Sequence, residues 1–360
     1  MATSFTFARR EALARTAPAP RIGDDMAMLR AAAELTRDLN TPNPRHYWTD
    51  LLLSSGLGWG ALAAAILAPS VGLMLLAGLV AALALYRAEM FIHEVSHIKH
   101  RDLPGFRAGY NLLVGVPLMT PSFMYEGVHN QHHAKTRYGT VDDPEYLPLA
   151  SMKPWSLPLF IAAAALAPIA FLVRFAVLVP LSLVIPGLRV PLEERWSSLA
   201  INPQFRRRIP EGEARALWLR LEAVTALWAL TLVALVASGI VPLKAFLIFL
   251  GVVSVVAVVN QVRTLVAHLW ENEDGDAMSV TAQYLDSVNV PPPALLPVLW
   301  APVGLRYHAL HHLLPGLPYH ALGEAHRRLS AALETGSVYH KASYKGLPGL
   351  VARLAQRTVR

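Results

Sequence analysis

The stretch LLLSSGLGWGALAAAILAPSVGLMLLAGLVAALALY, residues 51–86, contains no charged side chain. As one continuous helix it would run about 54 Å, whereas the hydrocarbon core of a bilayer is only about 30 Å thick. Pro69, Ser70 and Gly72 supply a turn inside it. The stretch therefore predicts two membrane spans, near residues 51–68 and 71–90.

A second uncharged pair of segments follows at Ala223–Leu243 and Ala245–Val262, with Pro242 marking the turn between them. Each is long enough to cross a bilayer. The apolar segment 157–188 differs, because it carries Arg174 and several prolines. We interpret it as an interfacial or re-entrant helical pair that does not change sides. The prediction is an all-α integral membrane protein with four transmembrane helices and interfacial helices.

Composition and charge agree with a membrane protein. The chain is 54% hydrophobic and 16% charged, with a formal net charge of +7. Its basic residues flank the apolar runs and lack the pattern of a nucleic-acid reader, so no nucleic-acid partner is expected. Arg206–Arg208 and the basic tail from Arg327 fall on the side of the N-terminus, which predicts that this side and both termini are cytoplasmic. A bacterial inner membrane is the expected location.

Three parts are expected along the chain. Residues 1–45 are predicted to be a partly disordered cytoplasmic segment, 46–340 the membrane domain, and 341–360 a basic cytoplasmic tail. Within them, residues 24–40 and 347–357 have amphipathic helical patterns that suit the surface.

The histidines carry the chemistry. Ten of the 14 fall in four places on the inferred cytoplasmic side. The sequence HEVSHIKH places three imidazoles within about 60° of one helix face, and each H-x-x-H-H sequence covers about 100° of a face. These positions are His93, His97 and His100, then His129, His132 and His133, then His308, His311 and His312, and finally His268 just beyond the last span.

So many imidazoles exceed the needs of one ion, so a pair of metals is the simplest explanation. Without cysteine, the chain can offer only nitrogen and oxygen ligands and cannot hold an iron–sulfur cluster by itself. His100 fits equally well as a ligand or as a residue that orients one, and His268 could be a ligand or an interfacial helix-end histidine. Asp142–Glu145 fits a helix start better than a source of carboxylates for the histidine rings.

This arrangement resembles the membrane fatty acid desaturase family, with three histidine boxes at His93/His97, His129/His132/His133 and His308/His311/His312. The sequences HHAKTRYGTVDDPEY and LRYHALHHLLPGLPYH are similar to that family in context. The resemblance implies a cytoplasmic helical cap that carries a histidine-rich di-metal site, and two iron ions with His268 as the ninth ligand. Family members have an asparagine four residues before that histidine, where this chain has Thr264. Glu94, Asp143 and Thr264 are the candidates for orienting the ligands.

The resemblance further implies O2-dependent oxidation of a fatty acyl chain, with desaturation expected and hydroxylation as the alternative. The substrate would be a fatty acyl lipid, acyl-CoA or acyl-ACP, and electrons would come from an external ferredoxin or cytochrome. A remote alternative is an intramembrane zinc metalloprotease, because HEVSH matches the H-E-x-x-H motif. Metal storage or transport is a third, although the spans contain few polar residues.

Overall fold

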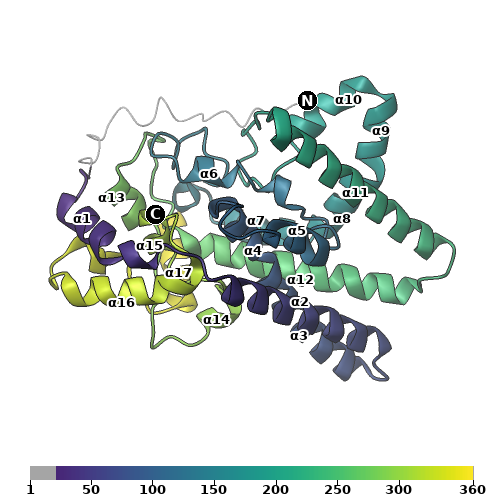
Figure 1. Ribbon diagram of the computed structural model, residues 1–360, viewed down its shortest axis with the longest axis horizontal. Coiled ribbons are helices and arrows are strands. Elements are labelled where there is room, and N and C mark those ends of the chain that lie inside the picture. Colours follow the sequence, from purple (N-terminus) through teal and green to yellow (C-terminus); the bar gives the residue numbers. More distant parts are fainter. Residues whose placement is uncertain (1–21, 360) are drawn as a thin grey trace.

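The computed structural model describes residues 22–359, which are helical with irregular connections and contain no β-strand. Its longest helices are α2 (Pro44–Leu67), α3 (Val71–Glu89), α11 (Gly212–Ala237) and α12 (Leu243–Ala267). In Figure 1 their free ends extend to the right, away from the smaller helices at the left. The predicted all-α membrane fold is confirmed.

Helices α2 and α3 form the predicted hairpin. The side chain of Asn43 caps the start of α2, and Ser70 caps the start of α3. A Cβ atom at Gly58 would lie only 2.6 Å from the Leu85 side chain, so the glycine permits the close approach of the two helices. An ion pair between Asp50 and Arg87 joins the two helices at their ends away from the turn. Helix α2 begins at Pro44, before the uncharged run.

The turn of the second hairpin lies slightly earlier than predicted. Helix α11 ends at Ala237 and not near Leu243, because Gly239 adopts a left-handed conformation (φ 77°) that a continuing helix excludes. Pro242 then directly precedes α12. At its other end α11 starts at Gly212, well before the uncharged segment, because a helix continues into the polar interface where its charged side chains reach water.

The segment between these hairpins folds into short, kinked helices. A π-helix at Arg174–Leu178 (η5) interrupts them. The buried guanidinium of Arg174 pairs with Glu222 of α11, with Nη2 2.8 Å from Oε1. The helices are α7 (Ser156–Ala164), α8 (Ala167–Val173), α9 (Val179–Val184) and α10 (Pro186–Glu194).

The number of membrane crossings depends on this segment. Residues 167–184 of this segment are long and apolar enough to cross a membrane, in addition to the four helices of the two hairpins. However, the amides of Ile201 and Asn202 donate to the Pro144 carbonyl, so the chain returns to the loop from which it left. We therefore still predict an even number of crossings between Pro144 and Ile201, and four crossings in total.

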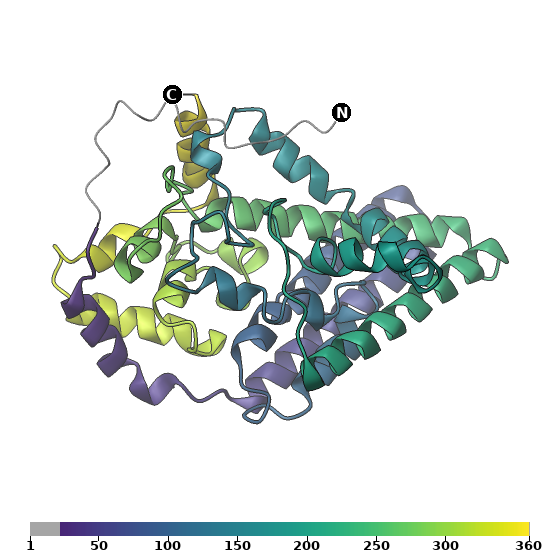
Figure 2. The ribbon, with the colours of Figure 1, turned by 90° about the horizontal axis from the view of Figure 1, so that it is seen from above.

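A further set of small helices covers the end of the molecule away from the two hairpin turns (Figure 1). Both amphipathic surface segments are helical as predicted: α1 packs on α16 through Met28 and Ala32, and α17 packs on α12. Figure 2 shows α1 and α16 side by side from above. The bounds are α1 (Met26–Leu35), α13 (Val280–Asp286), α16 (Leu322–Ala332) and α17 (Leu347–Thr358). Residues 1–21, the first part of the predicted N-terminal segment 1–45, lie outside the described range.

Candidate metal centre

Four short elements bring the nine predicted histidines together. Three are helices: α4 (Phe91–His97), α6 (His129–His132) and α15 (His308–Leu313). The fourth is the end of α12, where His268 is the first residue beyond the helix. The nine rings divide into two adjoining groups, each with one nitrogen per ring within 4.8 Å of the others.

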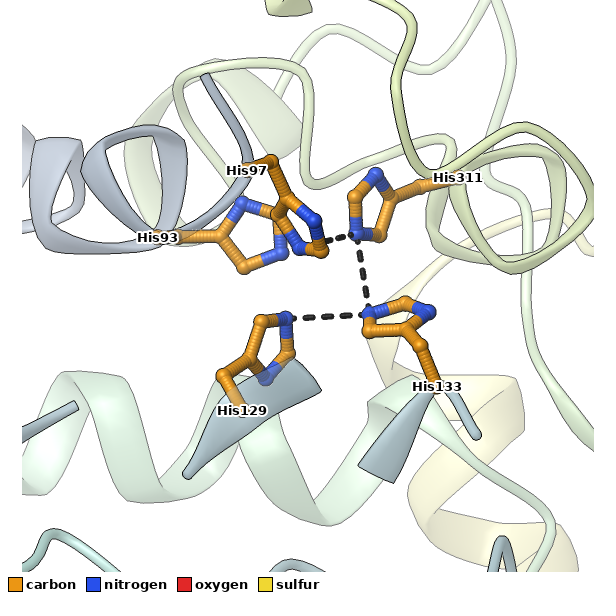
Figure 3. Close-up of side chains that lie close together, drawn as sticks. All are labelled: His93, His97, His129, His133 and His311. Carbon is orange, nitrogen blue, oxygen red and sulfur yellow. Dashed lines mark hydrogen bonds between the residues drawn. The ribbon is translucent and has the colours of Figure 1, made fainter. Parts of the chain in front are cut away.

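The first group contains five rings, drawn in Figure 3: His93, His97, His129, His133 and His311. Their Nε2 atoms approach closely, at 3.0 Å between His133 and His129 and 3.1 Å between His311 and both His97 and His133. Box one, box two and box three therefore all contribute to one group.

The second group contains four buried rings: His132, His268, His308 and His312. The Nε2 atom of His268 lies 3.0 Å from that of His308 and 3.3 Å from that of His132. His312 Nε2 lies 3.2 Å from His308 Nε2. Box two and box three are shared between the groups, whereas box one belongs to the first and His268 to the second.

These contacts fit a metal better than they fit hydrogen bonds. His132 donates through Nδ1 to Asp143 at 2.9 Å, and His268 directs Nδ1 at Tyr138, whose own hydroxyl donates to Asp286. When both rings are neutral, as binding of a shared metal requires, each has a single N–H group, so both Nε2 atoms present lone pairs to each other. Two donors bound about 2.1 Å from one ion at a right angle would lie about 3 Å apart, as observed here.

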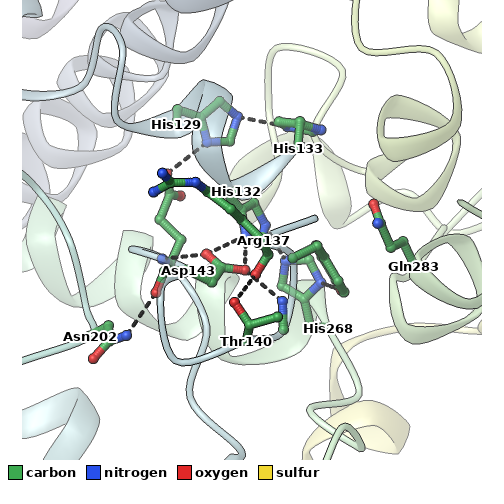
Figure 4. Close-up of polar contacts among 12 residues, drawn as sticks. His129, His132, His133, Arg137, Thr140, Asp143, Asn202, His268 and Gln283 are labelled. Carbon is green, nitrogen blue, oxygen red and sulfur yellow. Dashed lines mark hydrogen bonds and ion pairs between the residues drawn. The ribbon is translucent and has the colours of Figure 1, made fainter. Parts of the chain in front are cut away.

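Carboxylates and hydroxyls orient several rings. Asp143 holds His132, while Glu145 accepts from Nδ1 of His129 at 2.8 Å. Figure 4 shows Asp143 between His132 and the loop around Thr140. The interpretation of Asp142–Glu145 as a helix start is wrong: the segment is a turn. Asp143 instead accepts from the amides of Gly139 and Glu145, so its carboxylate is held in place for the ring.

The orienting groups around His268 were not predicted. Its Nδ1 lies 2.8 Å from the Tyr138 hydroxyl and 3.2 Å from Ser287 Oγ, and Tyr138 is in turn held by Asp286. Asp286 and Ser287 lie about twenty residues beyond the end of α12, after an irregular segment and at the end of α13. No local spacing in the sequence therefore links them to a histidine. Only the folding of this segment over the end of α12 brings them there.

Burial keeps most of these rings neutral, as metal ligands must be. It holds the pKa far below the usual histidine value at six positions outside the spans: His129, His133, His268, His308, His311 and His312. For His132 burial also acts to lower the pKa, but the Asp143 carboxylate outweighs it and the pKa is raised. Burial raises the pKa of Glu145 to about 7.

The other predicted site residues lie outside both groups. His100 is exposed, and its Nε2 contacts Glu126 at 3.0 Å and Arg107 at 2.8 Å. Glu94 is buried beside His93 and accepts from the Tyr47 hydroxyl and the Tyr319 amide. Thr264 is half-buried within α12, one turn before His268. The carboxylate of Glu94 is therefore occupied by protein donors.

Comparison with known proteins agrees with the geometry. The family model described as fatty acid desaturase matches residues 66–343. A ceramide hydroxylase of Caulobacter vibrioides (strain NA1000 / CB15N) is 50% identical over 327 residues, which cover 91% of this chain and 93% of the relative. Both matches include all three histidine boxes and His268. This chain belongs to the fatty acid desaturase family.

Proposed function

We propose that this protein hydroxylates a ceramide-like lipid with O2, at two iron ions bound by the nine histidines. The observation that carries the proposal is the pair of adjoining imidazole groups, five rings and four, each with one nitrogen per ring within 4.8 Å of the others. Similarity to a ceramide hydroxylase supports the choice of reaction and substrate.

Hydroxylation replaces desaturation as the favoured outcome. Both reactions need the same kind of site, and the histidine boxes alone do not separate them. The relative supports hydroxylation, because half of its residues are shared with this chain over nearly the full length of both. Desaturation stays the second candidate, supported by the family model.

Iron bound here would supply the redox chemistry that activates O2, and imidazole ligands suit it. The surrounding residues have their own tasks: Asp143 and Glu145 hold His132 and His129 in one tautomer, and burial keeps bulk water away from the rings. One oxygen atom would enter the product and the other would leave as water. This balance needs two electrons and two protons, for which we propose an external ferredoxin or cytochrome on the cytoplasmic side.

The metalloprotease alternative explains less. It would use His93 and His97 as zinc ligands and Glu94 as the general base. Glu94 instead binds Tyr47 and the Tyr319 amide, and the two histidines share their group with three others. A single zinc would leave the second group without a role.

Product analysis tests the proposal directly. Membranes containing the protein would receive ceramide, an electron donor and isotopically labelled O2. The expected product is ceramide carrying one labelled oxygen atom, found by mass spectrometry, and two irons per purified chain. A product lacking two hydrogens would favour desaturation, and a chain with one zinc would contradict the di-iron site.

Two histidine variants distinguish a metal ligand from a histidine outside the site. His132→Ala should abolish the product and lower the iron content, because its ring belongs to the second group. His100→Ala should keep both, because that ring is exposed and outside the groups. Full activity of His132→Ala would contradict the assignment of ligands.

A further inference from the structure

An uncharged, proline-rich run follows the last span and belongs to the predicted cytoplasmic cap. Residues 287–305 carry no charged side chain and include five prolines. Because proline interrupts a helix, this run cannot cross the bilayer as one helix. In the structure it is mostly irregular chain with one short helix, α14 (Pro297–Trp300). The run is therefore as free of charge as a span but is built as a loop.

The middle of this run, residues 291–300, presents large apolar side chains outward. Leu295, Leu296, Val298 and Leu299 are 81%, 69%, 58% and 46% exposed. Exposed apolar side chains are unfavourable in water, and several of them in one short segment mark a surface that contacts something apolar. The segment 291–300 is therefore a candidate interaction surface.

The position of the segment beside the spans indicates what it contacts. Helix α14 packs against α3 and α12, and Figure 1 shows it at the end of α3 away from the hairpin turn. Tyr86, near the end of α3, donates its hydroxyl hydrogen to the Trp300 carbonyl at 2.8 Å. Tyr86 is also the last residue of the uncharged run 51–86. Residue 300 therefore lies at the depth where the span reaches the membrane boundary, and the exposed side chains beside it are level with lipid.

The backbone of the segment suits an environment with little water. Unpaired backbone N–H and C=O groups are costly in lipid. Prolines have no N–H group, and the amides of Val298 and Leu299 donate to carbonyls inside the segment. Arg306 donates to the carbonyls of Val290 and Ala294, at 2.8 and 2.7 Å. These contacts reduce the number of polar groups that insertion would leave without a partner.

The two ends of the segment meet beside box three. The Val290 amide donates to the Arg306 carbonyl at 2.7 Å, so the chain returns to the place from which it left. Arg306 lies two residues before His308, and the Ala309 amide donates to the Val288 carbonyl at 3.2 Å. The position of the segment is therefore transmitted directly to α15.

We propose that residues 291–300 re-enter the leaflet on the histidine side as a shallow loop, and that this lipid anchor holds box three against the ends of the spans. The partner is the boundary between head groups and acyl chains, where apolar side chains of interfacial segments insert by about 5–10 Å. The inference is independent of the reaction catalysed. It adds a membrane contact to a part of the chain that the sequence pattern assigns entirely to the cytoplasm.

Fluorescence quenching in proteoliposomes tests the insertion. Because the chain has no cysteine, a Leu296→Cys variant can carry a single fluorescent dye. A phospholipid with a nitroxide near the top of its acyl chain quenches dyes in the bilayer, whereas iodide quenches dyes in water. The dye at position 296 should lose most of its fluorescence to the nitroxide lipid and little of it to iodide. Val298→Cys provides a second position that should behave in the same way.

Two reference positions calibrate the quenching. Leu79→Cys places the dye on α3 where the side chain is 51% exposed along the span, and Lys341→Cys places it on an exposed residue of the cap. A dye at position 296 that iodide quenches as strongly as the dye at position 341 contradicts the insertion. A dye at position 296 that neither agent reaches is covered by protein, such as a second copy of the chain, and also contradicts it.

Hydrogen exchange in lipid nanodiscs tests the link to box three. Replacing both Leu295 and Leu296 with serine should make the amides of α15 exchange about tenfold to hundredfold faster, because two leucine side chains lose their apolar contact with lipid. The matched control replaces Leu183 and Val184 with serine, an adjacent pair that is 79% and 74% exposed at the end of α9. Helix α9 contacts α10 and α11, so this pair should leave α15 unchanged. Equal exchange of α15 in the two double variants would show that the segment does not anchor box three.

Discussion

At the scale of single residues, the candidate centre depends on which nitrogen of each ring carries the hydrogen. Asp143 and Glu145 accept from Nδ1 of His132 and His129, and this leaves Nε2 of each ring free for a metal. These carboxylates come from a turn stabilised by its own backbone donors to Asp143. Ligand geometry is therefore set partly by residues that would never touch the metal.

Asp143→Asn should weaken metal binding about 10-fold to 100-fold, because the amide accepts less strongly from His132 and can present a donor instead. Iron content after dialysis against a graded series of chelator concentrations measures the change. Asp142→Asn is the matched control, since Asp142 is the adjacent exposed carboxylate. Equal iron retention by the two variants would remove Asp143 from the centre.

At the scale of elements, the segment 156–194 is attached to α11 by buried charges. Glu222 pairs with Arg174 and Arg189, and Glu193 of α10 pairs with Arg215. Arg174 also lies over the Phe175 ring, 4.3 Å from its centroid. Charged side chains in this apolar environment are tolerated only with partners. The ion pairs thus explain how Arg174 is accommodated in the apolar segment 157–188.

Glu222→Gln should destabilise the fold by about 3–5 kcal/mol, because it leaves the Arg174 cation buried without its counter-charge. Thermal unfolding in detergent measures this, with iron content recorded beside it. Glu213→Gln, an exposed change near the start of the same helix, should have little effect. A melting temperature for Glu222→Gln equal to that of Glu213→Gln would show that the buried pair contributes nothing.

At the scale of the whole molecule, sidedness follows from four crossings. Arg208 and Lys341 should face the same side as the histidines, and Lys244 the opposite side. The chain has no cysteine, so single-cysteine variants at these exposed positions can be labelled without background. A membrane-impermeant maleimide should label positions 208 and 341 together in inverted vesicles and position 244 in intact spheroplasts. With residues 93–150 on the cytoplasmic side, labelling of positions 208 and 341 in intact spheroplasts and of position 244 in inverted vesicles would indicate a single crossing by 167–184.

Metal removal should destabilise the entire cap. The two groups join α4, α6, α15 and the end of α12, which are far apart in the sequence. At a free metal concentration 100-fold above the dissociation constant, binding stabilises the native state by about 2.7 kcal/mol per site. Chelation should therefore lower the melting temperature, and Fe²⁺ should restore it. An unchanged melting temperature after complete iron removal would contradict a metal-linked cap.

The sequence by itself determined the membrane helices and the nine candidate ligands. Long uncharged runs can be satisfied only by helices in lipid, and the repeated H-x-x-H-H spacing is local, so both could be read along the chain. The tertiary structure decided how the rings divide into five and four, and it placed Tyr138, Asp286 and Arg263 around them. The contacts of Tyr138 with His268 and Asp286 join segments separated by more than a hundred residues. They depend on how the helices pack together, and no short stretch of sequence encodes that packing.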